Sequence, residues 1–125
     1  MDNMFGIYLK SLRLSRSPAM TQEALAQAIG RSKMTVSQFE SGKNSPPQGK
    51  LLDKIIDALE LNADEKEKLV FLAAKSRKTM PQDIEDYFFD NPAICSAIRA
   101  AMNNKEDVDW VKIASLVGGQ NGKNG

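Results

Sequence analysis

Apolar residues recur along this chain at the three- and four-residue spacing of amphipathic helices, and almost nowhere at the alternating spacing of a half-buried strand. Five stripes of this kind lie in the first 76 residues. Their apolar positions are Phe5, Leu9 and Leu12; Leu25, Ala28 and Ile29; Val36 and Phe39; Leu51, Leu52, Ile55, Ile56 and Leu59; and Leu69, Leu72 and Ala73. The pattern predicts an all-α protein that begins with a five-helix domain over residues 1–76.

Polar residues and glycines mark where these helices begin and end. Side chains with a short oxygen arm can accept a hydrogen bond from the free N–H groups of a first helical turn. The predicted caps are Thr21 and Ser32 for the second and third helices and the segment 62–65 for the fifth. Gly30 and Gly42 stand where the second and third helices should end in left-handed backbone. One of the prolines at 46 and 47 is expected in the first turn of the fourth helix.

Residues 77–118 predict a short C-terminal helical extension. An acidic and aromatic segment runs from Pro81 to Pro92, and Asp107 can cap the last helix. The later apolar positions are Ile94, Ile98, Ala101 and Met102, and then Trp110, Ile113, Ala114 and Val117. The first domain already has its own core, so we expect the extension to dimerise or to bind a protein partner. The glycine- and asparagine-rich residues 119–125 are predicted to be a flexible tail.

Composition excludes most catalytic chemistry. The chain has no histidine and a single cysteine, Cys95, which removes Ser-His-Asp hydrolysis, histidine and Cys/His metal sites, and an intrachain disulfide. The acidic cluster Asp83, Glu85 and Asp86 could be a metal site, but a solvated helix start is the favoured interpretation. We therefore expect no enzyme activity, no catalytic residues, no metal and no cofactor. No apolar run approaches the ~20 residues of a membrane span, and no signal peptide is apparent, so a cytoplasmic location is expected.

Charge is distributed unevenly along the chain. Residues 1–50 hold seven basic and three acidic side chains, a net charge of +4, whereas residues 51–125 hold ten basic and thirteen acidic ones, a net charge of −3. A basic first part on an acidic second part favours a polyanionic partner for the first part.

A helix, a short turn and a second helix form the most informative motif. It contains a T-Q-E-x-L-A start at residues 21–26, a glycine in the turn, a hydroxyl-rich helix, an E-x-G-K end at residues 40–43, and an L-L-x-x-I-x-x-A-L helix at residues 51–59. These five elements, in this order over roughly residues 4–62, resemble the Xre/Cro phage-repressor family of helix-turn-helix proteins. The resemblance implies a repressor-like fold in which the third helix enters the major groove of DNA.

Helical geometry selects candidate base-reading residues on the third helix. With Val36 and Phe39 facing inward, the opposite stripe consists of Lys33, Met34, Ser37 and Gln38. A lysine can donate to guanine, a glutamine can pair with adenine, a methionine can touch a thymine methyl group, and a serine can bond to several base edges. The alternatives are an ordinary solvated helix face and, for the methionine, a residue that fills a gap in the core.

Phosphate contacts are expected at two places. Thr21 and Gln22, with the backbone amides that open the second helix, would hold one phosphate, helped by the positive end of the helix dipole. Lys43 and Asn44 would hold another, although they could also be plain loop residues. Such contacts would fix the register of the protein on DNA without reading sequence.

The resemblance also implies a structural ion pair between Arg13, late in the first helix, and Glu40. The stretch from Arg13 to Thr21 is about two residues longer than is usual in the family, so Arg16 could take the place of Arg13. Two unrelated surface charges are the alternative. A partly buried bidentate pair would tie the first helix to the end of the third.

These features lead us to expect a sequence-specific DNA-binding transcriptional regulator, a repressor that binds a palindromic operator in double-stranded DNA as a homodimer. The alternative is an antitoxin-like or adaptor module in which residues 77–118 bind a partner protein. The segment P-x-D-I-x-D-Y-x-x-x-N-P-x-x-x-x-x-I, at residues 81–98, resembles regulators of mobile elements whose companion is a zinc metallopeptidase. A metallopeptidase or a toxin is therefore the expected kind of protein partner for residues 77–118.

Overall fold

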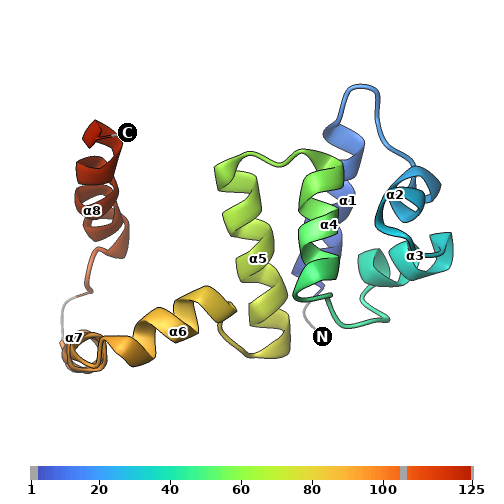
Figure 1. Ribbon diagram of the computed structural model, residues 1–125. Helices are drawn as coiled ribbons and strands as arrows, with labels where there is room; N and C mark the ends of the chain where they lie inside the picture. The colour runs from blue at the N-terminus through green and yellow to red at the C-terminus, as the bar shows by residue number, and fades with distance from the viewer. Residues whose placement is uncertain (1–2, 105–106, 125) are drawn as a thin grey trace. The chain divides into compact units, whose positions relative to one another are not determined.

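The computed structural model describes residues 3–104 and 107–124, which form eight helices and no strand (Figure 1). The helices are α1 (Met4–Ser15), α2 (Gln22–Ile29), α3 (Lys33–Ser41), α4 (Lys50–Leu59), α5 (Ala63–Arg77), α6 (Gln82–Asp90), α7 (Ala93–Asn103) and α8 (Trp110–Asn124). The prediction of an all-α protein is confirmed. The chain divides into two compact units, and the boundary lies within α6, between Ile84 and Glu85.

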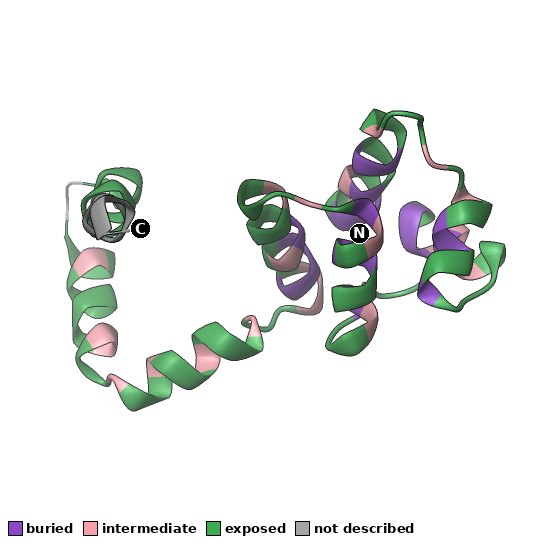
Figure 2. Ribbon diagram, turned by 45° about the horizontal axis from the view of Figure 1, so that its top comes forward, coloured by how far each residue is buried: buried purple, intermediate pink, exposed green. Residues whose placement is uncertain are grey.

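The first unit has a single hydrophobic core to which α1 to α5 all contribute (Figure 2). Its fully buried large side chains are Leu9, Leu25, Ile29, Val36, Ile55, Leu59 and Leu69. Burial of each such side chain contributes roughly 1.5–3 kcal/mol to folding. On α2 the buried alanine is Ala26, whereas Ala28, which we expected to face inward, is exposed. The two alanines lie at equal angles from the Leu25–Ile29 stripe, so periodicity could not choose between them.

The second and third helices begin at the predicted caps. The side-chain oxygen of Thr21 accepts from the Ala24 N–H at 3.0 Å, and that of Ser32 accepts from the Thr35 N–H at 3.2 Å. Each bond satisfies one backbone donor that a helix start leaves without a partner.

The predicted glycine helix ends and the predicted capping box are also present in the structure. Gly30 and Gly42 follow α2 and α3 in left-handed backbone, with φ of 71° and 82°. At the start of α5, the Asn62 side chain accepts from the Glu65 N–H at 2.8 Å, and the Glu65 carboxylate accepts from the Asn62 N–H at 3.1 Å. This reciprocal pair is the capping box that the sequence predicts.

Two predicted helix starts were wrong. Pro46 and Pro47 lie buried in the loop before α4, which begins only at Lys50, because the Arg77 guanidinium donates to both proline carbonyls at 3.1 and 3.2 Å and holds them in that loop. The residue that caps α8 is Asp109 rather than Asp107, since its carboxylate accepts from the Lys112 N–H at 2.9 Å.

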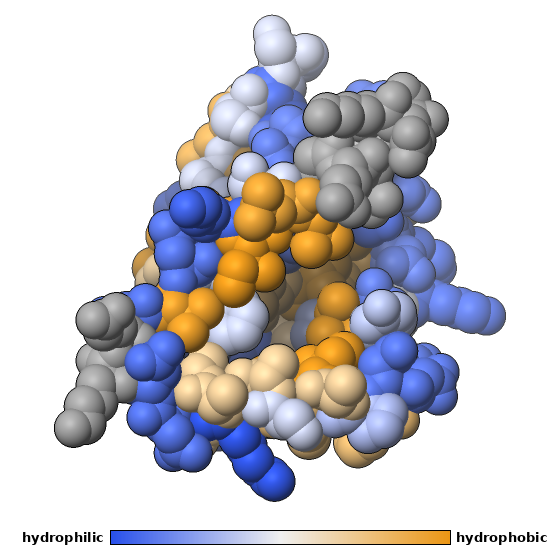
Figure 3. Space-filling view, turned by 90° about the vertical axis from the view of Figure 1, so that its left-hand side faces the viewer, coloured by the Kyte–Doolittle hydropathy of each residue, from blue (hydrophilic) through white to orange (hydrophobic). Residues whose placement is uncertain are grey.

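The second unit leaves much apolar surface exposed. Neither α6 nor α7 has a buried residue, and hydrophobic side chains gather on the face of the C-terminal helices seen in Figure 3. The large exposed ones from residue 85 onwards are Tyr87, Phe89, Ile98, Met102, Trp110, Val111, Ile113, Leu116 and Val117. The sequence predicts a flexible tail over residues 119–125, whereas α8 extends to Asn124, and residue 125 lies outside the described residues. None of the helices in the described ranges combines the length and the apolar character that a membrane crossing needs.

Candidate DNA interface

A short turn joins α2 to α3. The N–H of Gly30 donates to the Gln27 carbonyl, and the N–H of Arg31 donates back to the Ala26 carbonyl at 2.9 Å. These bonds close the end of α2, and Ser32 caps α3 at once. Because both helices also contribute to one core, their mutual angle is fixed by the turn and by packing.

The exposed face of α3 carries the four predicted base-reading residues. Lys33 and Met34 are exposed, and Ser37 and Gln38 are half-buried, while the opposite side of the helix is buried in the core. The Met34 side chain is 68% exposed, so it does not fill a gap in the core. The structure thus places these residues together on a surface, with a rigid base beneath them.

Gln38 and Asn44, which the sequence assigned to separate roles, are hydrogen-bonded to each other. The Asn44 Nδ2 donates to the Gln38 Oε1 at 2.8 Å, and the Asn44 backbone N–H donates to the Gln38 carbonyl at 3.2 Å. The loop after α3 therefore orients the Gln38 amide. One lone pair of Oε1 is used by Asn44, and the two N–H donors of Gln38 are the groups best placed for an external acceptor.

Behind this face, Arg13 and Glu40 form the ion pair that the resemblance implied. The Arg13 Nε and Nη2 donate to the two carboxylate oxygens of Glu40 at 2.7 and 2.9 Å, and both side chains are about 95% buried. The Arg13 Nη1 donates to the Met20 carbonyl at 2.8 Å. The hydrogen bond to Glu40 raises the pKa of Arg13. The pair joins α1, the following loop and the end of α3.

Gln22 belongs to the same network. Its Nε2 donates to the Glu40 Oε1 at 3.0 Å, so this side chain is half-buried at the start of α2 and is not a freely solvated amide. Thr21 is exposed, and its hydroxyl oxygen is engaged as the cap of α2. Of the four predicted phosphate-binding residues, Lys43 and Asn44 lie exposed after α3.

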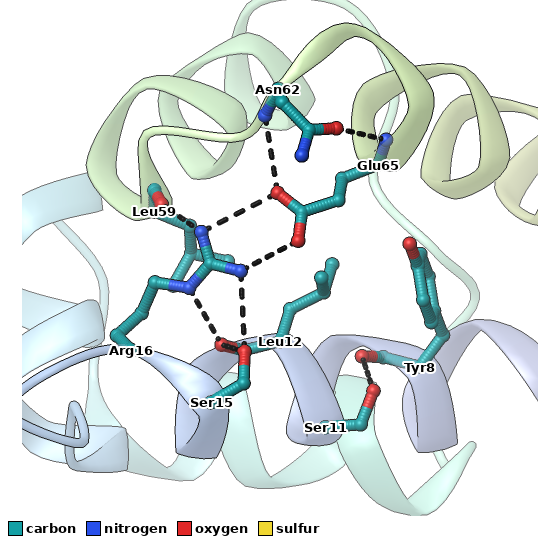
Figure 4. A network of polar contacts seen from close by, with 8 residues as sticks. All are labelled: Tyr8, Ser11, Leu12, Ser15, Arg16, Leu59, Asn62 and Glu65. Carbon is teal, nitrogen blue, oxygen red and sulfur yellow. Dashed lines mark hydrogen bonds and ion pairs between the residues drawn. The ribbon is translucent and has the colours of Figure 1, made fainter.

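Arg16 does not replace Arg13; it binds α5 instead (Figure 4). Its Nη2 donates to the Glu65 carboxylate at 2.8 Å and its Nη1 donates to the Leu59 carbonyl at 3.0 Å. These charges are partly exposed, with 23% and 24% of the two side chains accessible. The hydrogen bond from Arg16, followed by the one from the Asn62 N–H, lowers the pKa of Glu65.

Comparison with known proteins agrees with this geometry. Residues 4–69, more than half of the chain, match the family model of a helix-turn-helix domain. The chain belongs to the helix-turn-helix family. Its domain is of the Xre/Cro-like kind, with α3 in the position of the recognition helix, and the protein is a DNA-binding regulator. Comparisons with curated proteins and with solved structures found no match.

The helix-turn-helix geometry also draws attention to Arg31, which sequence reasoning missed. Arg31 is exposed in the turn, directly before the cap of the recognition helix, and its Nη1 donates only to the neighbouring Gly30 carbonyl among the hydrogen bonds of the described residues. Its place directly before Ser32, the N-cap of α3, was the available signal, because phosphate groups bind where basic side chains and helix N-termini meet. Within the described residues, no cluster of His, Cys, Asp or Glu side chains could hold a metal ion.

Proposed function

We propose that this helix-turn-helix protein is a sequence-specific transcriptional repressor that binds a palindromic operator in double-stranded DNA as a homodimer, without enzyme activity or a cofactor. The observation that carries the proposal is the exposed face of α3, which presents polar side chains outward while its other side is fixed in the core. A helix held in this way can enter a major groove as a rigid body.

Base reading belongs to Lys33, Met34, Ser37 and Gln38. Lys33 donates to guanine O6 and N7, Met34 contacts a thymine methyl group, and Ser37 bonds to the base edge that it meets. Gln38 donates from its amide nitrogen to N7 of a purine, since Asn44 already holds its oxygen at 2.8 Å.

Phosphate contacts surround this face. Lys43 and Asn44 bind one phosphate after α3, while Thr21, Gln22 and the first backbone amides of α2 bind another. The bond from Gln22 to Glu40 supports a positioning role for its side chain, so the amides of α2 carry most of the second contact.

A homodimer would place two recognition helices in successive major grooves, ~34 Å apart, which corresponds to a palindrome with one helical turn between half-sites. Binding of the first half-site then holds the second at high effective concentration. Repression follows where such an operator overlaps a promoter. Under this proposal the protein acts in the cytoplasm, where it meets the DNA.

Selection of bound genomic DNA fragments by the purified full-length protein tests the proposal, with the protein's own promoter scored first. The expected result is a palindromic motif whose affinity falls by orders of magnitude between ~50 and ~200 mM salt, because several phosphates are contacted by each subunit. Fragments without a shared motif, or binding that salt does not weaken, would refute it.

A pair of variants separates residues that read bases from residues that hold phosphates. Gln38→Ala should lose base preference at one position of each half-site, at a cost of ~1–3 kcal/mol, whereas Lys43→Ala should weaken binding to all sequences about equally. An unchanged motif for Gln38→Ala would mean that α3 is not the reading helix.

A second candidate function is an antitoxin-like or adaptor role, favoured by the exposed apolar side chains of residues 85–118. In that case this segment binds a partner protein, a metallopeptidase or a toxin, and DNA binding serves the complex. One test is to look for a stoichiometric complex between this chain and a protein encoded by a neighbouring gene. A complex that no longer forms when these apolar residues are changed would favour this function over a simple repressor.

A further inference from the structure

An apolar groove of about 830 Å³ runs along one side of α5 to the start of α6, entirely within the first unit. The residues of α5 that line it recur at every third and fourth position from Ala63 to Lys78, which is the spacing of a single helix face. At a rise of 1.5 Å per residue this face is about 22 Å long. The groove therefore has the length to hold an extended chain of atoms.

The interior of the groove is apolar. Val70, Phe71 and Ala74 contribute to it from α5, and Met80 and Ile84 contribute from the segment that follows. Phe71 is 57% exposed although it lies in the middle of a helix whose other side is buried in the core. Because the transfer of an alkyl group from water to apolar surroundings is favourable, this interior suits the apolar body of a ligand.

Charged side chains line the groove, and cations outnumber anions among them. The cations are Lys66, Lys75 and Lys78, and the anions are Glu67 and Asp83. None of the five forms an ion pair within the described part of the chain. Lys66 and Glu67 are neighbours near the start of α5, where their charges offset each other. Lys75 and Lys78 lie three residues apart at the end of α5, where Asp83 supplies a single negative charge, so this end of the groove is positive.

The size of the groove favours a small molecule over a protein partner. Its volume lies within the ~300–1,000 Å³ of typical ligand sites. Thirteen residues line it, whereas a stable protein interface takes ~20–30 residues from each side. A linear ligand with one anionic headgroup matches both the length of the apolar interior and its positive end.

We propose that this groove binds an amphipathic organic anion, a long-chain carboxylate, with its alkyl chain along Phe71 and its headgroup beside Lys75 and Lys78. The two ammonium groups donate charge-assisted hydrogen bonds to the carboxylate oxygens. The alkyl chain covers the exposed side of Phe71 and the apolar positions beside it.

The site lies next to a support of the DNA interface. Arg77, in the same last turn of α5 as Lys75, donates from its Nη1 to the carbonyls of Pro46 and Pro47 at 3.1 and 3.2 Å. These prolines belong to the loop after α3, which also carries Lys43. A ligand packed against the last turn of α5 stabilises that turn and the loop that it holds. Under the proposed function, on which this step rests, the bound carboxylate therefore strengthens operator binding.

Isothermal titration calorimetry of the full-length protein with sodium dodecanoate, below the concentration at which it forms micelles, tests the site. Dodecyltrimethylammonium is the control with the opposite charge, and octanoate is the control with a shorter chain. Dodecanoate should bind at least ~10-fold more tightly than either, because the cationic headgroup is repelled by two lysines and octanoate buries four fewer CH₂ groups. Equal affinity for the two headgroups, or for the two chain lengths, would overturn the proposal.

Variants locate the headgroup. The double variant Lys75→Glu, Lys78→Glu should raise the dodecanoate Kd at least ~10-fold and should bind dodecyltrimethylammonium more tightly than the parent does. The double variant Lys75→Arg, Lys78→Arg keeps both charges and should retain binding. Lys54→Glu changes an exposed lysine of α4 outside the groove and should leave the Kd unchanged. Equal Kd values for all of these proteins would overturn the placement of the carboxylate.

Two aromatic residues locate the alkyl chain. Phe71→Asp should abolish dodecanoate binding in a folded protein, because the side chain is exposed and its loss does not open the core. Phe89→Asp is the matched control, since this exposed aromatic residue belongs to the second unit, and it should bind as the parent does. Circular dichroism would check that all variants are equally helical. Binding that Phe89→Asp abolishes and Phe71→Asp does not would place the ligand in the second unit and overturn the proposal.

Operator binding separates failure of this site from failure of the proposed function. Saturating dodecanoate should lower the operator Kd at least ~5-fold, and by linkage the operator should lower the dodecanoate Kd by the same factor. Operator binding that is unchanged or weakened would overturn the regulatory step. Dodecanoate binding without specific DNA binding would overturn the proposed function and support the site, and the reverse result would overturn the site alone. A dodecanoate Kd that rises with protein concentration would mean that a second copy covers the groove, which would also overturn the site.

Discussion

The buried ion pair behind the recognition helix gives the sharpest test of the fold. Replacing Glu40 by glutamine keeps the size of the side chain but removes its charge and one acceptor oxygen. Three donors converge on the Glu40 carboxylate, namely the Nε and Nη2 of Arg13 and the Nε2 of Gln22. In Glu40→Gln an amide NH₂ group would face at least one of these donors, and the buried Arg13 would lose its counter-charge.

The expected cost follows from burial. Removal of one partner from a buried ion pair costs about 3–5 kcal/mol, because the remaining charge is left without compensation. Arg13 keeps its bond to the Met20 carbonyl, which places Glu40→Gln near the lower end, at about 3 kcal/mol. That is a large share of the ~5–15 kcal/mol that stabilises a typical domain.

Glu65→Gln is a matched control, because it also neutralises a glutamate bound to arginine but at a partly exposed site. Glutamine preserves the capping box of α5, and solvent can compensate Arg16, so its loss should be much smaller than that of Glu40→Gln. Urea denaturation followed by circular dichroism at 222 nm would compare the two; Trp110 fluorescence is unsuitable, since it reports on the second unit. Equal losses for the two variants would refute the assignment of Arg13 and Glu40 as a buried structural pair.

Three further predictions follow from single contacts. Gly6→Ala should destabilise the first unit by about 1–3 kcal/mol in urea denaturation, because a Cβ at this helical glycine would meet backbone carbonyl oxygens of α3. The Phe39 oxygen, for example, would lie 2.5 Å from that Cβ. Gly118→Ala is the control: a Cβ there would meet nothing within 4 Å, so this change should instead raise the helicity of α8. The Arg16 hydrogen bond lowers the pKa of Glu65, so the stability that the ionised Glu65 contributes is present above the ordinary pKa of 4.5 and is lost as the pH falls below that value. Urea denaturation midpoints should therefore fall more steeply below pH 4.5 in the parent protein than in Glu65→Gln. If Gln38 reads a base as proposed, Asn44→Ala should reduce base preference at that position, because Asn44 orients the Gln38 amide; a loss of affinity equal for all sequences would show that Asn44 only holds phosphate.

Local signals in the sequence predicted most of the first unit because they act over a few residues. A cap at Thr21 or Ser32 needs only a side-chain oxygen and the N–H group three residues on, and Gly30, around which a Cβ would meet nothing within 4 Å, needs only freedom to adopt positive φ. The start of α4 escaped prediction because the prolines before it are held by Arg77, about thirty residues further along the chain. Proline is compatible both with a first helical turn and with a loop, so only the distant contact decides.

Partner choice among long polar side chains lies beyond the reach of periodicity. Arg13 and Arg16 are both plausible partners for Glu40 by sequence, and the distinction depends on the direction in which α1 ends relative to α3 and α5. The sequence predicts DNA contacts for Gln22 and Gln38, because a glutamine amide can bind a phosphate or the edge of a base. Their bonds to Glu40 and Asn44 become visible only when α2, α3 and the loop after α3 are brought together.

The recognition helix owes its conformation to what lies behind and beside it, not to its own sequence. It has nine residues, several of them β-branched or hydroxyl-bearing, and an isolated helix of this length and composition is unstable in water. Ser32 caps its start, Gly42 ends it, and Val36, Phe39 and Glu40 are buried beneath it. None of these five residues belongs to the stripe formed by Lys33, Met34, Ser37 and Gln38. Substitutions in that stripe should therefore leave the stability of the fold unchanged, and under the proposed function they would alter the preferred operator. If the exposed side reads DNA as proposed, stability and DNA specificity are carried by opposite sides of one short helix, and substitutions of exposed residues should change specificity without changing the free energy of unfolding.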